Sequence, residues 1–183
     1  VWGTVRDTPA DRKRLIADWT RKINASTLTP DFALGRAVFA KTCQHCHTLY
    51  GLGGKVGPDI TGSNRADLAY LLENIFDPSA VIPKEYAATK IDLLDGRVVT
   101  GIIKEETATT LTVATERELL TIPVKDVDKR TPSPLSMMPD DLTKQATEPE
   151  IRALVAYLRF NRQVPMKATE ENVKDFFNGK DLT

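Results

Sequence analysis

The sequence predicts a mainly α-helical domain with a small antiparallel β-sheet or barrel inserted into it, an α+β arrangement overall. Two observations lead to this prediction. Apolar residues recur every three or four positions in several segments before residue 77 and again in residues 148–160, which is the period of an amphipathic helix. Between residues 86 and 130 apolar and polar residues instead alternate, as they do in a half-buried strand.

Ser, Thr or Asn stands at the start of each of the first three predicted helices. These side chains can accept hydrogen bonds from the free N–H groups of a first turn. These helices are expected to run from Thr8 to about Ile23, from Thr29 to Cys43, and from Ser63 or Asn64 to Asp77. Gly35 lies inside the second helix, where a glycine costs about 1 kcal/mol relative to alanine. We therefore expect a close crossing at Gly35 by the helix of residues 148–160.

The alternating stretch predicts four strands and a short fifth, over residues 89–94, 97–103, 109–115, 118–122 and 126–129. The first two are joined by Asp95-Gly96, a sequence typical of a tight hairpin turn. The stretch contains neither Cys nor His. A packing or docking role is therefore expected for the inserted sheet.

A C-x-x-C-H motif, Cys43-Gln44-His45-Cys46-His47, follows the second predicted helix and contains both cysteines of the chain. It indicates covalent attachment of one c-type haem, with a thioether from each thiol and His47 as proximal iron ligand. His45 is expected to be a solvent-facing spacer. A zinc site and a thioredoxin-like dithiol are the alternatives. Zinc normally takes ligands from two separated pairs, however, and a dithiol motif should follow a strand.

A glycine-rich loop, residues 51–59, comes directly after the motif. Glycines let a backbone approach a flat ligand closely, and metal-bound histidines need a partner for their second ring nitrogen. The carbonyl of Pro58 is the candidate partner for His47. Arg65, a little further on, is expected either to pair with a haem propionate or to be a solvated surface arginine.

Met137 and Met138 lie in an irregular, proline-rich segment, residues 131–139. A haem bound by one histidine has a free sixth position, which a thioether sulfur can fill. A methionine is more often core filling than a ligand, and the residues alone leave both sulfurs as candidates.

The overall composition restricts the choice of partners. The chain has 183 residues, and its 25 basic and 25 acidic residues give a formal charge of zero. No overall field therefore recruits nucleic acid or an anionic membrane. No apolar run has the length of a membrane span. The chain starts at Val1 with no leader sequence, and we expect it to be part of a longer protein.

Residues 30–161 resemble the cytochrome c haem-binding domain of planctomycete and verrucomicrobial multidomain proteins. The motifs that carry the resemblance occur in the same order: Gly35-Arg36-Ala37-Val38-Phe39, the C-x-x-C-H motif, Val56-Gly57-Pro58-Asp59-Ile60-Thr61-Gly62, Tyr70-Leu71-Leu72-Glu73-Asn74-Ile75, Asp77-Pro78-Ser79-Ala80-Val81-Ile82, Asp95-Gly96-Arg97, Ser136-Met137-Met138-Pro139 and Ile151-Arg152-Ala153-Leu154-Val155-Ala156-Tyr157-Leu158.

The resemblance implies a class I cytochrome c-like helical fold around one haem c. It also implies His47 and Met138 as the axial iron ligands, because the family places its methionine before the proline. The haem environment is then expected to include Pro58, Arg65, Gly57, Met137 and Tyr50. Phe176-Phe177-Asn178-Gly179-Lys180-Asp181-Leu182-Thr183 at the end of the chain resembles the opening strand of 3-keto-disaccharide hydrolase domains.

These resemblances predict three segments: residues 1–28 as the end of an upstream domain, 29–165 as the cytochrome c domain, and 166–183 as a tail leading to a following domain. We expect a periplasmic or otherwise exported electron-transfer domain that serves a redox partner protein or domain and is not itself an enzyme. The alternatives are a haem peroxidase or gas sensor with an open sixth position, and an interaction module without haem.

Overall fold

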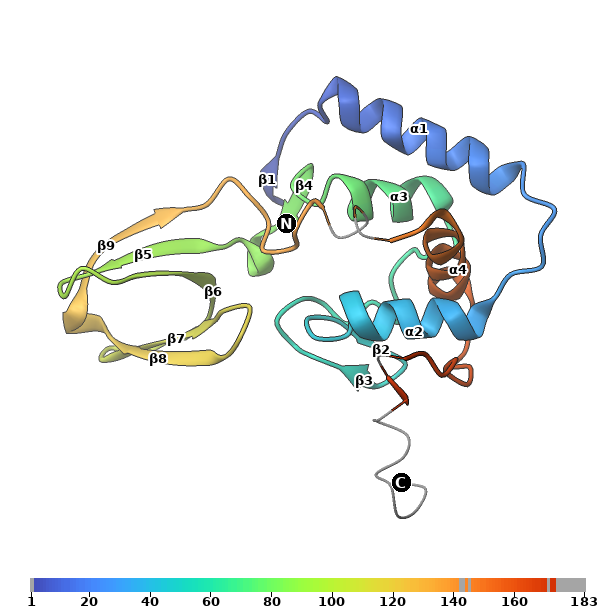
Figure 1. Cartoon of the computed structure of the whole chain (residues 1–183). Coiled ribbons are helices and arrows are strands. Elements are labelled where there is room, and N and C mark those ends of the chain that lie inside the picture. The colour runs from blue at the N-terminus through green and yellow to red at the C-terminus, as the bar shows by residue number, and fades with distance from the viewer. Residues whose placement is uncertain (1, 142–143, 145, 171, 174–183) are drawn as a thin grey trace, which may run out of the picture.

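A computed structural model describes residues 2–141, 144, 146–170 and 172–173. Within that part, four α-helices gather on one side and a five-stranded antiparallel sheet lies on the other (Figure 1). The helices are α1 (Ala10–Asn24), α2 (Phe32–Thr42), α3 (Leu68–Phe76) and α4 (Glu148–Arg159). None of the helices in the described residues has the length and apolar composition of a membrane span. The hydrolase-like stretch 176–183 lies outside the described residues.

The prediction of a mainly α-helical, class I cytochrome c-like fold is wrong. Helices make up 33% of the structure and strands 24%. The first three predicted helices also begin later than expected. The first begins at Ala10 with no side-chain cap from Thr8, the second at Phe32 and the third at Leu68. Asp67 caps α3 because its carboxylate accepts hydrogen bonds from the backbone N–H groups of Ala69 and Tyr70.

Two short strand pairs within the helical side were not predicted. β1 (Trp2–Val5) pairs with β4 (Val81–Pro83), and β2 (Thr48–Leu49) pairs with β3 (Leu52–Gly53). The pairing of β1 with β4 is reinforced by an ion pair between Arg6 and the buried Asp77. The N-terminal strand is therefore fastened to the segment that follows α3.

The inserted sheet has the strand order β8-β7-β6-β5-β9. Its strands are β5 (Thr89–Leu93), β6 (Val98–Glu106), β7 (Thr110–Ala114), β8 (Leu119–Pro123) and β9 (Val127–Pro132). The predicted hairpin between the first two is confirmed, with Gly96 at a φ of +86° in the turn. Ile91, Leu111 and Val113 are fully buried in a small core that belongs to the sheet alone.

A larger core lies between the helices. The predicted crossing at Gly35 is confirmed: a Cβ there would lie 2.1 Å from the carbonyl oxygen of Ala153 in α4. The Trp19 ring of α1 stacks on Phe76 of α3, with ring centroids 6.1 Å apart. α1 thus shares the core of the other three helices.

Candidate haem site

A cavity of about 320 Å³ opens between the two halves of the structure. Its lining comes from the turn after α2, the glycine-rich loop, one face of α3, the segment around β4, the inserted sheet, and the loop after β9. Cys43, Cys46, His47, Met137 and Met138 all contribute to the lining. Segments far apart in the sequence thus meet around one space.

The C-x-x-C-H motif forms a tight turn at the end of α2. The backbone N–H groups of Cys46 and His47 both donate to the carbonyl of Cys43, at 3.1 and 2.9 Å. This turn directs both free thiols and the imidazole to the cavity. Burial raises the pKa of the Cys43 thiol to about 11, with Thr42 as its hydrogen-bonding neighbour, so the thiol is uncharged near neutral pH.

His47 has a fixed tautomer. Its Nδ1 lies 3.0 Å from the carbonyl oxygen of Pro58. Because a carbonyl oxygen can only accept, Nδ1 carries the proton and Nε2 keeps a free lone pair. Burial lowers the pKa of His47, and the Pro58 hydrogen bond opposes part of that effect. The imidazole is therefore neutral and able to ligate a metal through Nε2.

The glycine-rich loop packs directly against the motif. The N–H of Gly54 donates to the carbonyl of Gln44 at 2.8 Å, and that of Gly57 to Cys46 at 2.9 Å. A Cβ on Gly57 would lie only 2.7 Å from Cε1 of His47. The absence of a side chain at this position leaves the imidazole room beside the loop.

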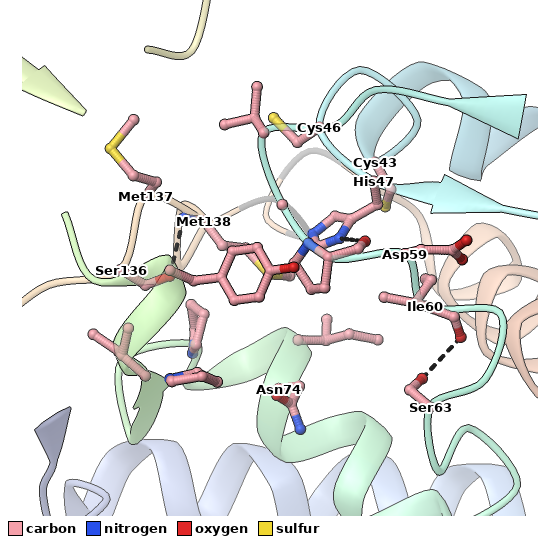
Figure 2. A pocket seen from close by; sticks show the side chains of 18 of the residues that line it. Cys43, Cys46, His47, Asp59, Ile60, Ser63, Asn74, Ser136, Met137 and Met138 are labelled. Atoms are coloured by element: carbon pink, nitrogen blue, oxygen red, sulfur yellow. Dashed lines mark hydrogen bonds between the residues drawn. The ribbon is translucent and has the colours of Figure 1, made fainter. Parts of the chain in front are cut away.

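The side chains of Met137 and Met138 point in different directions. Figure 2 shows the Met138 side chain extending toward His47, whereas the Met137 side chain extends away from it. The N–H of Met138 donates to the hydroxyl of Ser136 at 3.1 Å, and the N–H of Ser136 donates to the hydroxyl of Ser79 at 3.0 Å. Since residues 133–141 form neither helix nor strand, such side-chain bonds hold the loop in place.

Arg65 is not the solvated surface arginine that the sequence left open, because its side chain is buried and the residue is 8% exposed. Its guanidinium donates to several backbone carbonyls at the end of α4 and before α3, which are those of Ile60, Thr61, Leu158 and Phe160. Arg65 lines the cavity. Tyr50 does not line it: its hydroxyl lies 3.2 Å from Arg65 Nη1, and its ring packs beside the guanidinium.

Several residues that line the cavity were not identified from the sequence. Tyr70 and Asn74 lie one turn apart on α3, both exposed and outside the apolar stripe that periodicity assigned to the core. Ile102 and Glu116 come from the inserted sheet, for which we expected packing or docking. No signal in a single sequence reveals which strand residues would face a distant helix.

Two polar contacts join the inserted sheet to the C-x-x-C-H turn and the glycine-rich loop. Nε2 of His45 donates to the carbonyl of Glu116 at 2.6 Å. The ammonium of Lys104 donates to the carbonyl of Val56 at 2.9 Å. His45 is exposed, as expected of a spacer, and in addition it contacts the sheet. The sheet thereby forms one wall of the cavity.

Residues 30–89 match a protein family described as cytochrome C oxidase, cbb3-type, subunit III. The match supports a cytochrome c-like domain. It covers about a third of the chain and includes α2, the C-x-x-C-H turn, the glycine-rich loop and α3. A search among curated proteins found no match. The matched family implies a covalently bound haem c and haem-based electron transfer in general.

The cavity fits such a group. Two free thiols stand at its edge, the free Nε2 of His47 belongs to its lining, and apolar side chains such as Leu71 and Ile102 supply walls. Within the described residues no group of three or more His, Cys, Asp and Glu side chains is arranged to hold a metal ion. The zinc alternative therefore has no ligand set in that part of the chain.

Proposed function

We propose that this chain is a single-haem electron-transfer domain. Cys43 and Cys46 would hold the haem covalently, and His47 and Met138 would ligate its iron. The observation that carries the proposal is that His47 and Met138 line one cavity, with the imidazole proton on Nδ1 and the Met138 side chain extending toward the ring. The haem supplies the one-electron chemistry when bound.

The protein's own residues have three tasks in this function. Pro58 orients His47, because its carbonyl accepts the Nδ1 proton. A thioether at the sixth position raises the reduction potential relative to two nitrogen ligands. α3 and the inserted sheet provide walls of the cavity, and the apolar surroundings of a metal site bear on its potential.

The domain passes electrons between a redox partner protein or domain and an acceptor and does not itself turn over a substrate. Its resemblance to domains of multidomain bacterial proteins supports a place in a larger, exported redox protein, because covalent haem attachment normally occurs on the exported side of a bacterial membrane. Arg65 would be the partner of a haem propionate in this arrangement, because its buried guanidinium lines the cavity while its backbone hydrogen bonds hold it in place.

The test is replacement of the two methionines. Met138→Ala should leave the iron five-coordinate or water-bound, so that the ferrous protein takes up carbon monoxide readily, and Met138→His should lower the midpoint potential. Met137→Leu is the matched control and should alter neither property, as expected of a residue that only packs. The opposite pattern would assign Met137 as the ligand. If neither substitution matters, a gas-binding function with another sixth ligand replaces the proposal.

Covalent attachment has its own test. A haem absorption spectrum that persists after the protein is denatured and extracted with acidic acetone establishes thioether bonds, since a haem held only by its iron ligands dissociates. Loss of the haem on extraction would contradict the assignment of Cys43 and Cys46.

A further inference from the structure

The loop that carries Met138 contacts the helical side at Ser79 and also at a second residue, Arg12. Arg12, in the first turn of α1, forms an ion pair with the carboxylate of Asp140, two residues after Met138. The same guanidinium donates through Nη1 to the backbone carbonyl of Asp140, at 2.9 Å. Both the side chain and the main chain of Asp140 are thus bound to one arginine.

Arg12 also binds the end of α3. Its Nη1 lies 3.2 Å from the carbonyl oxygen of Phe76, the last residue of that helix. α3 supplies one wall of the cavity through Tyr70, Leu71 and Asn74. One guanidinium therefore links the wall of the cavity to the methionine loop.

Arg12 is itself held in place. It lies two helical turns before Trp19 on the same face of α1, and Trp19 stacks on Phe76. Its side chain is only 18% exposed, although Asp140 is 59% exposed. The planar guanidinium has several donors in a fixed geometry, so it can bind two carbonyls and a carboxylate at once. A flexible surface lysine could not reproduce this set of contacts.

We propose that Arg12 is a positioning residue for the sixth iron ligand. It holds the segment Ser136–Asp140 against α3, so that the Met138 sulfur stays at the depth in the cavity that the iron requires. The proposal rests on the His/Met ligation given above. Because residues 133–141 have no helix or strand to hold them, the loop depends on Arg12 and Ser79 for its position.

The test compares Arg12→Ala, Arg12→Lys and Arg21→Ala in the haem-loaded protein. Arg21 is the matched control, because it lies on the same helix and forms an exposed ion pair with Asp18. The readouts are the methionine-to-ferric-iron charge-transfer absorption, the rate of carbon monoxide uptake by the ferrous protein, and hydrogen exchange at the Met138 amide.

Arg12→Ala should weaken the charge-transfer band and raise the carbon monoxide rate and the amide exchange rate about tenfold, because both contacts with Asp140 in the loop and the contact with Phe76 in α3 are lost together. Arg12→Lys should restore part of each property, and Arg21→Ala should change none. Asp140→Ala removes the same ion pair from the loop side and leaves α1 unaltered, so it gives the same direction of change even if Arg12→Ala folds poorly.

Two results would overturn the inference, and they are distinguishable. If Met138→Ala removes the charge-transfer band but Arg12→Ala and Asp140→Ala resemble Arg21→Ala, the ligand assignment stands and the positioning role of Arg12 is wrong. If Met138→Ala leaves the band and the carbon monoxide rate unchanged, the proposed ligation fails, and the inference fails with it.

Discussion

Replacing Gly35 by alanine tests the helix crossing behind the haem cavity. A Cβ at this position would lie 2.1 Å from the carbonyl oxygen of Ala153, and 2.6 Å from both the carbonyl carbon of Ala153 and Cβ of Tyr157. These are main-chain or adjacent atoms of α4, so no side-chain rotation can move them away. The substitution must push α2 and α4 apart.

The magnitude follows from two opposing effects. Alanine is a better helix former than glycine by about 1 kcal/mol. Overpacking a buried contact costs about 1–3 kcal/mol when neighbours can adjust, and the backbone of α4 cannot adjust without loosening the buried Tyr157 and Leu154. We therefore expect Gly35→Ala to lower the free energy of unfolding by about 2 kcal/mol.

The measurement is urea unfolding of the haem-loaded protein, with haem content determined for each sample. Gly62→Ala is the control, because a Cβ there meets nothing within 4 Å, and its free energy of unfolding should change by less than about 1 kcal/mol. If Gly35→Ala instead raises the free energy of unfolding by about 1 kcal/mol, helix propensity decides and the close crossing is refuted.

Three further predictions concern the site, one helix cap and the N-terminal helix. A Cβ on residue 57 would lie 2.7 Å from the His47 ring as it now stands. Gly57→Ala should therefore turn the ring and alter the haem absorption spectrum. An unchanged spectrum would contradict the close packing. Hydrogen bonds from Thr147 lower the pKa of Glu150 below its ordinary 4.5. The ionised carboxylate therefore stabilises the fold above pH 4.5, and this stabilisation is lost as the pH falls through the lowered pKa. Glu150→Gln should flatten this part of the pH dependence of urea unfolding. Trp19→Ala should cost about 3–5 kcal/mol in the same assay, whereas a near-zero cost would mean that the helix is dispensable to the core.

The sequence was sufficient to predict a feature where a single residue or short motif itself restricts the geometry. The Asp95-Gly96 hairpin was predictable because a two-residue turn imposes its own geometry on the strands beside it. The crossing at Gly35 was predictable because a glycine inside a helix has few other uses. The hydrogen bond from His47 to Pro58 was an expectation of metal-site chemistry, and the two residues are close in the chain.

The sequence was insufficient where a contact joins distant segments and neither segment carries a residue pattern that indicates the contact. Strand β1 pairs with β4 some eighty positions away, and short strands of this kind have no periodicity of their own. The ion pair between Arg12 and Asp140 joins residues 128 positions apart and depends on how helix α1 meets the loop after β9. The mainly α-helical prediction failed for a related reason, since it gave the inserted sheet too little weight relative to the helices.

The strands that begin and end the inserted sheet lie side by side. Thr89 pairs with Pro132, and the N–H of Ser133 donates to the carbonyl of Ala88 at 2.8 Å. The chain thus leaves the helical side and returns to it at one point. A variant that joins Ala88 directly to Ser133 would keep every helix and both proposed iron ligands but lose the wall formed by the sheet. Carbon monoxide uptake by the shortened, haem-loaded chain would measure how far the sheet limits access to the cavity.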